Sequence, residues 1–381
     1  MSKKKLILLV EDIFSKRDYN RYCIKDLKKW FDVKFIDFTY YLRKDYFKKY
    51  LKLFSYKNYY KYIFIVKKKK DFDKIQESIN VHHKYLVLDL AFSQNYNNKN
   101  MLNLKHFFYK KKNIDLVFLN LGSLPIPSYI FYYLKIKNFF LFCLRKFFLG
   151  NVIYYNYFIS SGKLSYNYGL NYKKNLPMHS LDFNKYLIEN KSNTLPEIKY
   201  KKYAVFLDDM MPDHPENFVY KKSIINFHVY FKLIKNFFLD FRKKNDLKIV
   251  FASHPRRKNL DKIKELKIFD DYALDKTLNI VKFSKLVFVH YSTSVSFASI
   301  FKKPIVYLNS KKINHFHNKI NAMQNETGGL LVDLEDVSTW DINLKKIDFN
   351  KYKSYRDNHL KHPHSKNKMF VETLLDLSLK K

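Results

Sequence analysis

The chain has 381 residues, and 47% of them are hydrophobic, so it can bury two cores and does not have the composition of a disordered protein. Its 72 Lys and Arg residues exceed its 35 Asp and Glu residues and give a formal charge of +37. The basic residues are spread over the whole chain, and no zinc finger or helix-turn-helix motif accompanies them, so charge alone does not indicate nucleic-acid binding. With two cysteines and six glycines, the sequence also offers no disulfide framework and no glycine-rich phosphate loop.

The first half of the chain alternates short apolar runs with helical periods. The run KLILLV (5–10) is bounded by charged residues and predicts a buried parallel strand, followed by a helix over 17–30. Further strands are predicted over 33–38, 62–66, 85–90, 115–122 and 151–160. This alternation predicts an N-terminal Rossmann-like domain over residues 1–175, followed by a polar linker over 176–200.

The second half begins the same alternation again. YAVFLDD (203–209) predicts a strand, and apolar residues at three- and four-residue steps predict a long helix over 224–241. Strands over 247–253, 285–291 and 303–308 follow, with helices over 260–266, 274–284 and 294–301 between them. We predict a second Rossmann-like domain over 201–335 and a helical tail over 336–381. The fold class is therefore α/β, with two Rossmann-like domains and ligands bound in the cleft between them, beyond the carboxyl ends of the strands.

The first strand end with unusual chemistry is LDDMMPDHPE (207–216). Asp208 and Asp209 end the predicted strand, and His214 follows in the same loop. One interpretation is a solvated turn whose carboxylates cap the next helix. The other is a binding or catalytic loop that faces the cleft. The acidic residues and His214 do not follow the spacing of a known metal motif, so no metal is expected.

The second strand end is FASHPRRK (251–258). His254 can hydrogen-bond a phosphate oxygen and titrate near neutral pH, and Pro255 fixes the turn that presents it. Arg256 adds positive charge to the same loop. The alternative is a loop histidine that packs against the following helix.

The third strand end is VHYSTSVSFAS (289–299). Ser292, Thr293 and Ser294 open a predicted helix, and His290 lies at the same end of the strand. Hydroxyl groups in this position either cap the helix or help to bind an anion beside its free N–H groups. Because the carboxyl ends of parallel strands share one edge, the three strand ends together predict a cradle for a nucleotide phosphate.

The HP motif at 254–255, the hydroxyl cluster at 292–294 and the following KKPIVYL resemble GT-B glycosyltransferases that build bacterial surface polysaccharides. The likeness is greatest to sialyltransferase-like enzymes that use CMP-activated acidic sugars, and it covers most of residues 200–310. It implies that His254 and the hydroxyls of Ser292, Thr293 and Ser294 contact the nucleotide and its phosphate. It also implies a nucleotide-sugar donor as substrate, with no metal or other cofactor.

The general base is not fixed by this resemblance, because the acidic pair followed by glycine in that family's N-terminal domain is absent here. Asp12, Asp208 and Asp209 remain as alternatives. The expected reaction is an inverting displacement that moves a sugar, such as a sialic-acid-like nonulosonate, onto a lipopolysaccharide or capsule glycan.

Residues 128–150 combine aromatic and leucine side chains with lysines and arginine, which indicates either a surface that contacts a membrane or a buried helix. We expect a cytoplasmic protein, peripheral at the inner face of the membrane, that does not bind nucleic acid. Two other functions stay open: a nucleotide-sugar epimerase of similar shape, and a basic membrane- or nucleic-acid-binding protein without enzymatic activity.

Overall fold

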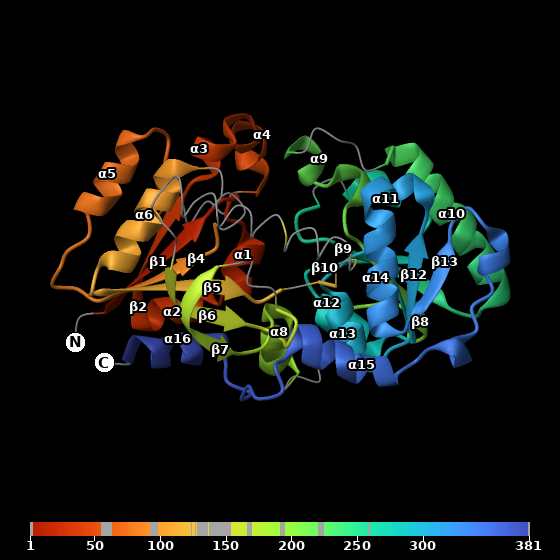
Figure 1. Ribbon diagram of the computed structural model, residues 1–381. Coiled ribbons are helices and arrows are strands. Elements are labelled where there is room, and N and C mark those ends of the chain that lie inside the picture. Colours follow the sequence, from red (N-terminus) through yellow and green to blue (C-terminus); the bar gives the residue numbers. More distant parts are fainter. Residues whose placement is uncertain are drawn as a thin grey trace. The chain divides into compact units, whose positions relative to one another are not determined.

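A computed structural model gives the arrangement of the chain (Figure 1). It describes residues 3–54, 63–91, 98–122, 124–125, 127, 136, 154–165, 170–190, 195–219, 225–257 and 260–379. Two compact units are present. Unit 1 comprises Met1–Ser123, Tyr129–Leu181 and His362–Lys381, and unit 2 comprises Leu124–Ser128 and Asp182–Lys361.

Unit 1 is built on a parallel seven-stranded sheet with the order β3-β2-β1-β4-β5-β6-β7. The strands are β1 (Lys4–Val10), β2 (Phe31–Asp37), β3 (Ile63–Ile65), β4 (Tyr85–Asp89), β5 (Ile114–Asn120), β6 (Tyr154–Ser160) and β7 (Asn171–Pro177). Its helices are α1 (Lys16–Arg21), α2 (Ile24–Trp30), α3 (Thr39–Leu42), α4 (Lys44–Phe54), α5 (Lys70–Glu77), α6 (Lys99–Lys110) and α16 (Phe370–Leu379). The strand order reverses between β1 and β4, which marks the switch point of a doubly wound sheet.

The continuous apolar run of β1 is explained by burial on both faces of this sheet. Ile7 and Leu9 pack in one core with α5 and α6, whereas Leu6 and Leu8 pack in a second core with α2 and α16. Alternate residues of a strand point to opposite faces, so a strand covered on both sides must be apolar throughout.

Unit 2 is built on a parallel six-stranded sheet with the order β10-β9-β8-β11-β12-β13. The strands are β8 (Tyr203–Leu207), β9 (Lys248–Ser253), β10 (Asp271–Leu274), β11 (Leu286–Val289), β12 (Ile305–Asn309) and β13 (Leu330–Asp333). The α-helices are α8 (Leu181–Glu189), which starts at the unit boundary, α9 (Glu216–Val219), α10 (Phe227–Lys244), α11 (Leu260–Lys264), α12 (Thr277–Phe283), α13 (Val295–Ile300), α14 (His317–Thr327) and α15 (Asn350–Tyr355). Short 3₁₀ turns lie at η2 (Met211–Asp213), η3 (Lys311–Phe316), η4 (Val337–Thr339) and η5 (Leu344–Lys346), and Arg356–Leu360 (η6) is π-helical. Here the strand order reverses between β8 and β11.

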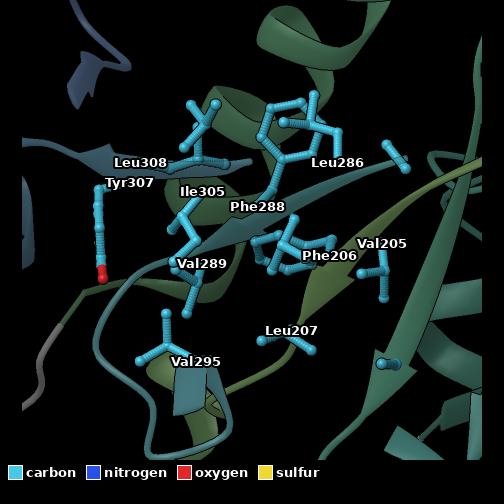
Figure 2. Close-up of a cluster of buried hydrophobic side chains, with 14 of the residues drawn as sticks. Val205, Phe206, Leu207, Leu286, Phe288, Val289, Val295, Ile305, Tyr307 and Leu308 are labelled. Carbon is cyan, nitrogen blue, oxygen red and sulfur yellow. The ribbon is translucent and has the colours of Figure 1, made fainter. Parts of the chain in front are cut away.

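The core of unit 2 is rich in aromatic side chains. Phe206 of β8 stacks on Phe269, with ring centroids 5.6 Å apart, and Phe238 of α10 meets Phe288 of β11 edge-on at 5.2 Å. Figure 2 shows side chains of β8, β11 and β12 gathered in this cluster, together with Val295, the first residue of α13. This packing fixes the two strands at the switch point, β8 and β11, and therefore the loops that follow them.

The predicted fold class is confirmed: both units are parallel α/β sheets of Rossmann type. The predicted helix over 17–30 is two helices, because Cys23 adopts a left-handed conformation with φ of 50° and breaks it. The predicted linker over 176–200 contains the end of β7 and all of α8.

The boundaries of the compact units also differ from the predicted ones. The last twenty residues of the predicted tail return to unit 1, because Phe370, Leu374 and Leu377 of α16 are buried in its core. Residues 128–150, for which a membrane contact was the hypothesis, lie outside the described residues except for Ile136. Within the described part of the chain, no helix combines the length and apolar character needed to cross a bilayer.

Candidate functional site

The three strand ends predicted from the sequence meet at the switch point of unit 2. β8 pairs with β9 on one side and with β11 on the other, and all three strands run parallel. The acidic pair follows β8, the HP motif follows β9 and the hydroxyl cluster follows β11. Crevices at such switch points are where open α/β sheets bind ligands.

Asp208 joins the end of β8 to the loop after β9. Its side chain is 2% exposed and forms a two-pronged ion pair with Arg257: Nε lies 2.5 Å from Oδ2, and Nη2 lies 2.8 Å from Oδ1. Oδ2 also accepts the backbone N–H of His254 at 3.0 Å, and Oδ1 accepts that of Met210 at 2.9 Å. Burial favours a raised pKa for Asp208, but the Arg257 hydrogen bonds and charge outweigh it, so the pKa is lowered. Both oxygens are thus committed to holding the loops in place.

Arg257 is the residue of this site that the sequence interpretation missed. Its side chain is fully buried and reaches a second carboxylate, with Nη1 2.8 Å from Oδ2 of Asp213. The planar guanidinium therefore links the β8 loop at two points to the loop that carries the HP motif. The second arginine of HPRR was visible in the sequence, but in a chain with 72 basic residues it carries no distinguishing signal.

Asp209 joins the end of β8 to the loop on the other side. Its Oδ2 accepts the backbone N–H of Tyr291 at 2.8 Å. Its Oδ1 is buried and has no hydrogen-bond partner among the described residues. Burial raises the pKa of Asp209 to about 7, against the Tyr291 hydrogen bond, and the neighbouring charge of Asp208 adds to the rise. Asp209 is therefore a carboxylic acid that exchanges a proton near neutral pH.

The HP loop is held by its backbone as well as by the buried side chain of Arg257. The half-buried ring of His254 accepts the N–H of Arg256 through Nδ1 at 3.2 Å, and Pro255 is exposed between them. The Arg257 N–H donates to the His254 carbonyl at 2.9 Å and closes the turn. The loop is thus fixed before any ligand arrives.

The hydroxyl loop leads from β11 into α13. The Ser292 hydroxyl accepts the N–H of Ser294 at 3.3 Å. The side-chain hydroxyls of Thr293 and Ser294, both half-buried, have no hydrogen-bond partner within the described residues, and Ser294 does not cap α13 with its side chain. Two hydroxyl groups at this loop therefore remain available to a bound group.

The two predicted histidines of unit 2 outside the HP motif have different positions. His290 is fully buried: Nδ1 lies 2.6 Å from the Leu308 carbonyl, and Nε2 lies 2.9 Å from the Tyr230 hydroxyl. Burial lowers its pKa to about 4, so the ring is neutral at physiological pH. With both nitrogens bonded inside the protein, His290 supports the strand end rather than facing a ligand. His214 is half-buried and ends η2 in the loop after β8.

The third catalytic candidate, Asp12, belongs to unit 1. Its Oδ1 accepts the Tyr46 hydroxyl and the Ile13 N–H, both at 2.8 Å. Two other carboxylates occupy strand ends of the same sheet. Burial raises the pKa of Asp37, at the end of β2, to about 6, against hydrogen bonding by Thr39. Asp89, at the end of β4, is fully buried and pairs with Lys105 at 2.7 Å.

The described residues contain no group of three or more His, Cys, Asp and Glu side chains arranged to hold a metal ion.

Comparisons with known proteins extend the fold assignment. No protein-family model matches the sequence, and no curated protein matches it significantly. A solved variant of the wall teichoic acid polymerase TagF is 12% identical, covering 98% of this chain and 88% of that chain with a TM-score of 0.51. UDP-GlcNAc 2-epimerase from Methanocaldococcus jannaschii is 15% identical over 100% of both chains (TM-score 0.48), and MurG from Acinetobacter baumannii is 6% identical over 98% of both (TM-score 0.47). The likeness to TagF shows a shared GT-B fold.

Proposed function

We propose that this protein is a glycosyltransferase that uses a nucleotide-activated sugar and binds the nucleotide portion at the carboxyl edge of the unit 2 sheet. One observation carries the proposal: the adjacent carboxylates Asp208 and Asp209 each hold one of the two predicted binding loops. Asp208 accepts the N–H of His254, and Asp209 accepts that of Tyr291. The HP loop and the hydroxyl loop are therefore fixed on either side of the switch point.

The chemistry available at this edge suits a departing phosphate. In an inverting displacement, the acceptor hydroxyl oxygen attacks the anomeric carbon and the bond to the nucleotide phosphate breaks. The electron pair of that bond leaves on the phosphate, and the acceptor proton passes to a carboxylate. His254, Thr293 and Ser294 offer a ring and two hydroxyls that can stabilise the phosphate charge. We assign these three residues to nucleotide binding.

We retain Asp12 and Asp209 as the alternatives for the base. Asp208 is the weakest of the three predicted candidates, since Arg257 occupies both of its oxygens. The finer substrate assignment rests on the motif resemblance alone: a CMP-activated acidic sugar as donor and a lipopolysaccharide or capsule glycan as acceptor, used at the inner face of the cytoplasmic membrane. The net charge of +37 favours such anionic partners.

Thermal unfolding in the presence of CMP, CDP, UDP, GDP and ADP tests nucleotide binding directly. A ligand at about 100 times its dissociation constant stabilises the folded protein by roughly 2.7 kcal/mol, so one nucleotide should raise the unfolding temperature. His254→Ala should remove this shift and sugar transfer while leaving the unfolding temperature of the free protein nearly unchanged. Full transfer activity in His254→Ala would contradict the proposal, and so would no response to any of the five nucleotides.

The fold does not separate transfer from epimerisation, because both TagF and the UDP-GlcNAc 2-epimerases resemble this chain. Incubation with the donor alone separates them. A transferase leaves the sugar configuration of the donor intact until an acceptor is added, whereas an epimer formed without acceptor would replace the transferase assignment.

A further inference from the structure

Asp209 lies between the HP loop and the hydroxyl loop of the proposed nucleotide site, and no cation among the described residues forms an ion pair with it. It lies at the end of β8, and its Oδ2 accepts the N–H of Tyr291, the residue directly before the hydroxyl cluster. Its Oδ1 is buried, and no donor reaches it from the described residues. An ionised carboxylate in this position therefore keeps one buried oxygen without a hydrogen bond, which disfavours the charged form.

Among the charged groups around Asp209, the charge of Arg257 lowers its pKa, but this effect is the smallest of those that act on Asp209 and burial outweighs it. Asp208, which precedes it in the loop after β8, has the same charge sign, and Arg257 directs its hydrogen bonds to Asp208 and to Asp213. From α10 and the end of β11, Tyr230 and His290 bond to each other, and burial keeps both neutral. An anion bound at the adjacent hydroxyl loop would place a further negative charge near Asp209.

We propose that Asp209 couples nucleotide binding to proton uptake: the phosphate binds to the form in which Asp209 is protonated and expels the form in which it is ionised. This inference rests on the proposed function, because it requires the phosphate of a nucleotide at the same edge. It leaves Asp12, and not Asp209, as the base, because a protonated Asp209 cannot take the proton of the acceptor. It needs no contact between the phosphate and the buried Oδ1, since two like charges in a poorly solvated site repel one another over several ångströms.

The direction of the pH dependence follows from the protonation state of the free protein. Burial raises the pKa of Asp209 to about 7, so it is largely protonated at pH 6 and largely ionised at pH 8. A bound phosphate raises that pKa further, so the complex holds more protons than the free protein between these values. Linkage then requires that affinity fall as pH rises, by about five- to tenfold from pH 6 to pH 8 for a rise in the pKa of one to two units.

Isothermal titration calorimetry with CMP-N-acetylneuraminic acid and UDP-N-acetylglucosamine tests this coupling, because the phosphates of both probes stay fully ionised from pH 6 to pH 8. Each titration is run in two buffers of different ionisation enthalpy, which gives the number of protons taken up. The wild-type protein should take up about half a proton per nucleotide sugar near pH 7 and bind about five- to tenfold more weakly at pH 8 than at pH 6. Any residual pH dependence from His254 is measured in the variants.

Asp209→Asn keeps an oxygen for the Tyr291 N–H but cannot titrate. The affinity of this variant for the nucleotide sugars should no longer fall between pH 6 and pH 8 because of Asp209. The proton uptake that Asp209 causes on binding should also be lost. Asp261→Asn is the matched control, because Asp261 lies on α11 with its side chain 91% exposed, and it should behave as the wild-type protein does.

The outcomes separate the two proposals. Binding by the wild-type protein without proton uptake near pH 7 overturns the coupling and leaves the proposed function standing, and this result does not depend on whether Asp209→Asn folds. Proton uptake that persists unchanged in folded Asp209→Asn also overturns it. Absence of binding by either nucleotide sugar at any pH from 6 to 8 removes the proposed function and the coupling with it.

Discussion

The sheets of the two units follow the same strand order up to the sixth strand, and among the described residues each has a buried carboxylate–cation pair at a strand end. In unit 1, Asp89 at the end of β4 pairs with Lys105 of α6, and both side chains are at most 1% exposed. In unit 2, Asp208 after β8 pairs with Arg257, which belongs to the loop after β9. The same chemical device therefore holds a helix in one unit and a loop in the other.

The two pairs differ in the geometry of the cation and in the part of the chain that carries it. Lys105 is a point charge that also donates to the Ala91 carbonyl at 2.7 Å, and the Tyr155 hydroxyl completes the pair from β6 at 2.6 Å from Asp89. All of these residues are buried in the core of unit 1. Arg257 has a planar guanidinium that can bind both oxygens of a carboxylate. Because Arg257 lies three residues after His254, its ion pair also holds the HP loop in place. Only the second arrangement should matter to ligand binding.

Breaking the two pairs should have the largest effects and should separate these roles. Arg257→Met and Lys105→Met each leave a buried carboxylate without its cation, so each should lower the free energy of unfolding by about 3–5 kcal/mol. Chemical denaturation measures this loss. In the folded protein at low temperature, Arg257→Met should also abolish the stabilisation by nucleotide, whereas Lys105→Met should retain it.

The double variant Asp208→Asn/Arg257→Met provides the control for stability. It removes the buried charge of Asp208 and leaves only the partly exposed carboxylate of Asp213 without its cation, so it should recover part of the lost stability without recovering nucleotide binding. The comparison between the units breaks down if Lys105→Met loses nucleotide binding as completely as Arg257→Met does, or if Arg257→Met binds normally.

A smaller, pH-dependent effect should distinguish the unpaired carboxylates of the two units. For both Asp209 and Asp37 the folded protein has a raised pKa, about 7 and about 6 against an ordinary 3.8. The folded state thus binds more protons than the unfolded state above pH 4, and stability falls as pH rises until each group is ionised. At about 1.4 kcal/mol per pKa unit the limit for Asp209 is about 4 kcal/mol, of which we expect roughly half because part of the side chain is exposed.

Replacement by asparagine removes this penalty. Asp209→Asn should match the wild-type stability near pH 4 and exceed it increasingly up to pH 7, while the gain from Asp37→Asn should level off one pH unit lower. Urea denaturation from pH 4 to pH 8 measures both curves. A gain that does not depend on pH would show that the substitutions act through packing and not through the charge.

The sequence was sufficient for the parts of the fold that depend on local pattern. Continuous apolar runs located β1, β8, β9, β11 and β12, because a strand covered on both faces must be apolar. Strand ends with polar residues then located Asp208, Asp209, His254 and the hydroxyl cluster, since parallel strands bring their carboxyl ends to one edge. The structure places these residues in the loops that follow neighbouring strands of one sheet.

Features that depend on contacts between distant parts of the chain could not be predicted from local sequence patterns. The strand β7 is polar, with the sequence NYKKNLP, and the packing of α16 in unit 1 joins residues about 340 positions apart. The roles of Asp208 and Arg257 were hidden for a similar reason. Whether a carboxylate is a base or one half of an ion pair is decided by its partner, and nothing in HPRR distinguishes Arg257 from Arg256.

Hydrogen–deuterium exchange with and without a nucleotide that shifts the unfolding temperature shows which unit binds the nucleotide, because it compares the two strand-end edges in one experiment. We expect slower exchange in peptides that cover residues 208–214, 253–257 and 290–296 of unit 2. We expect no change at residues 10–13, 37–39 and 89–91 of unit 1. Protection confined to the unit 1 peptides, or nucleotide binding without protection of the unit 2 loops, would contradict this expectation.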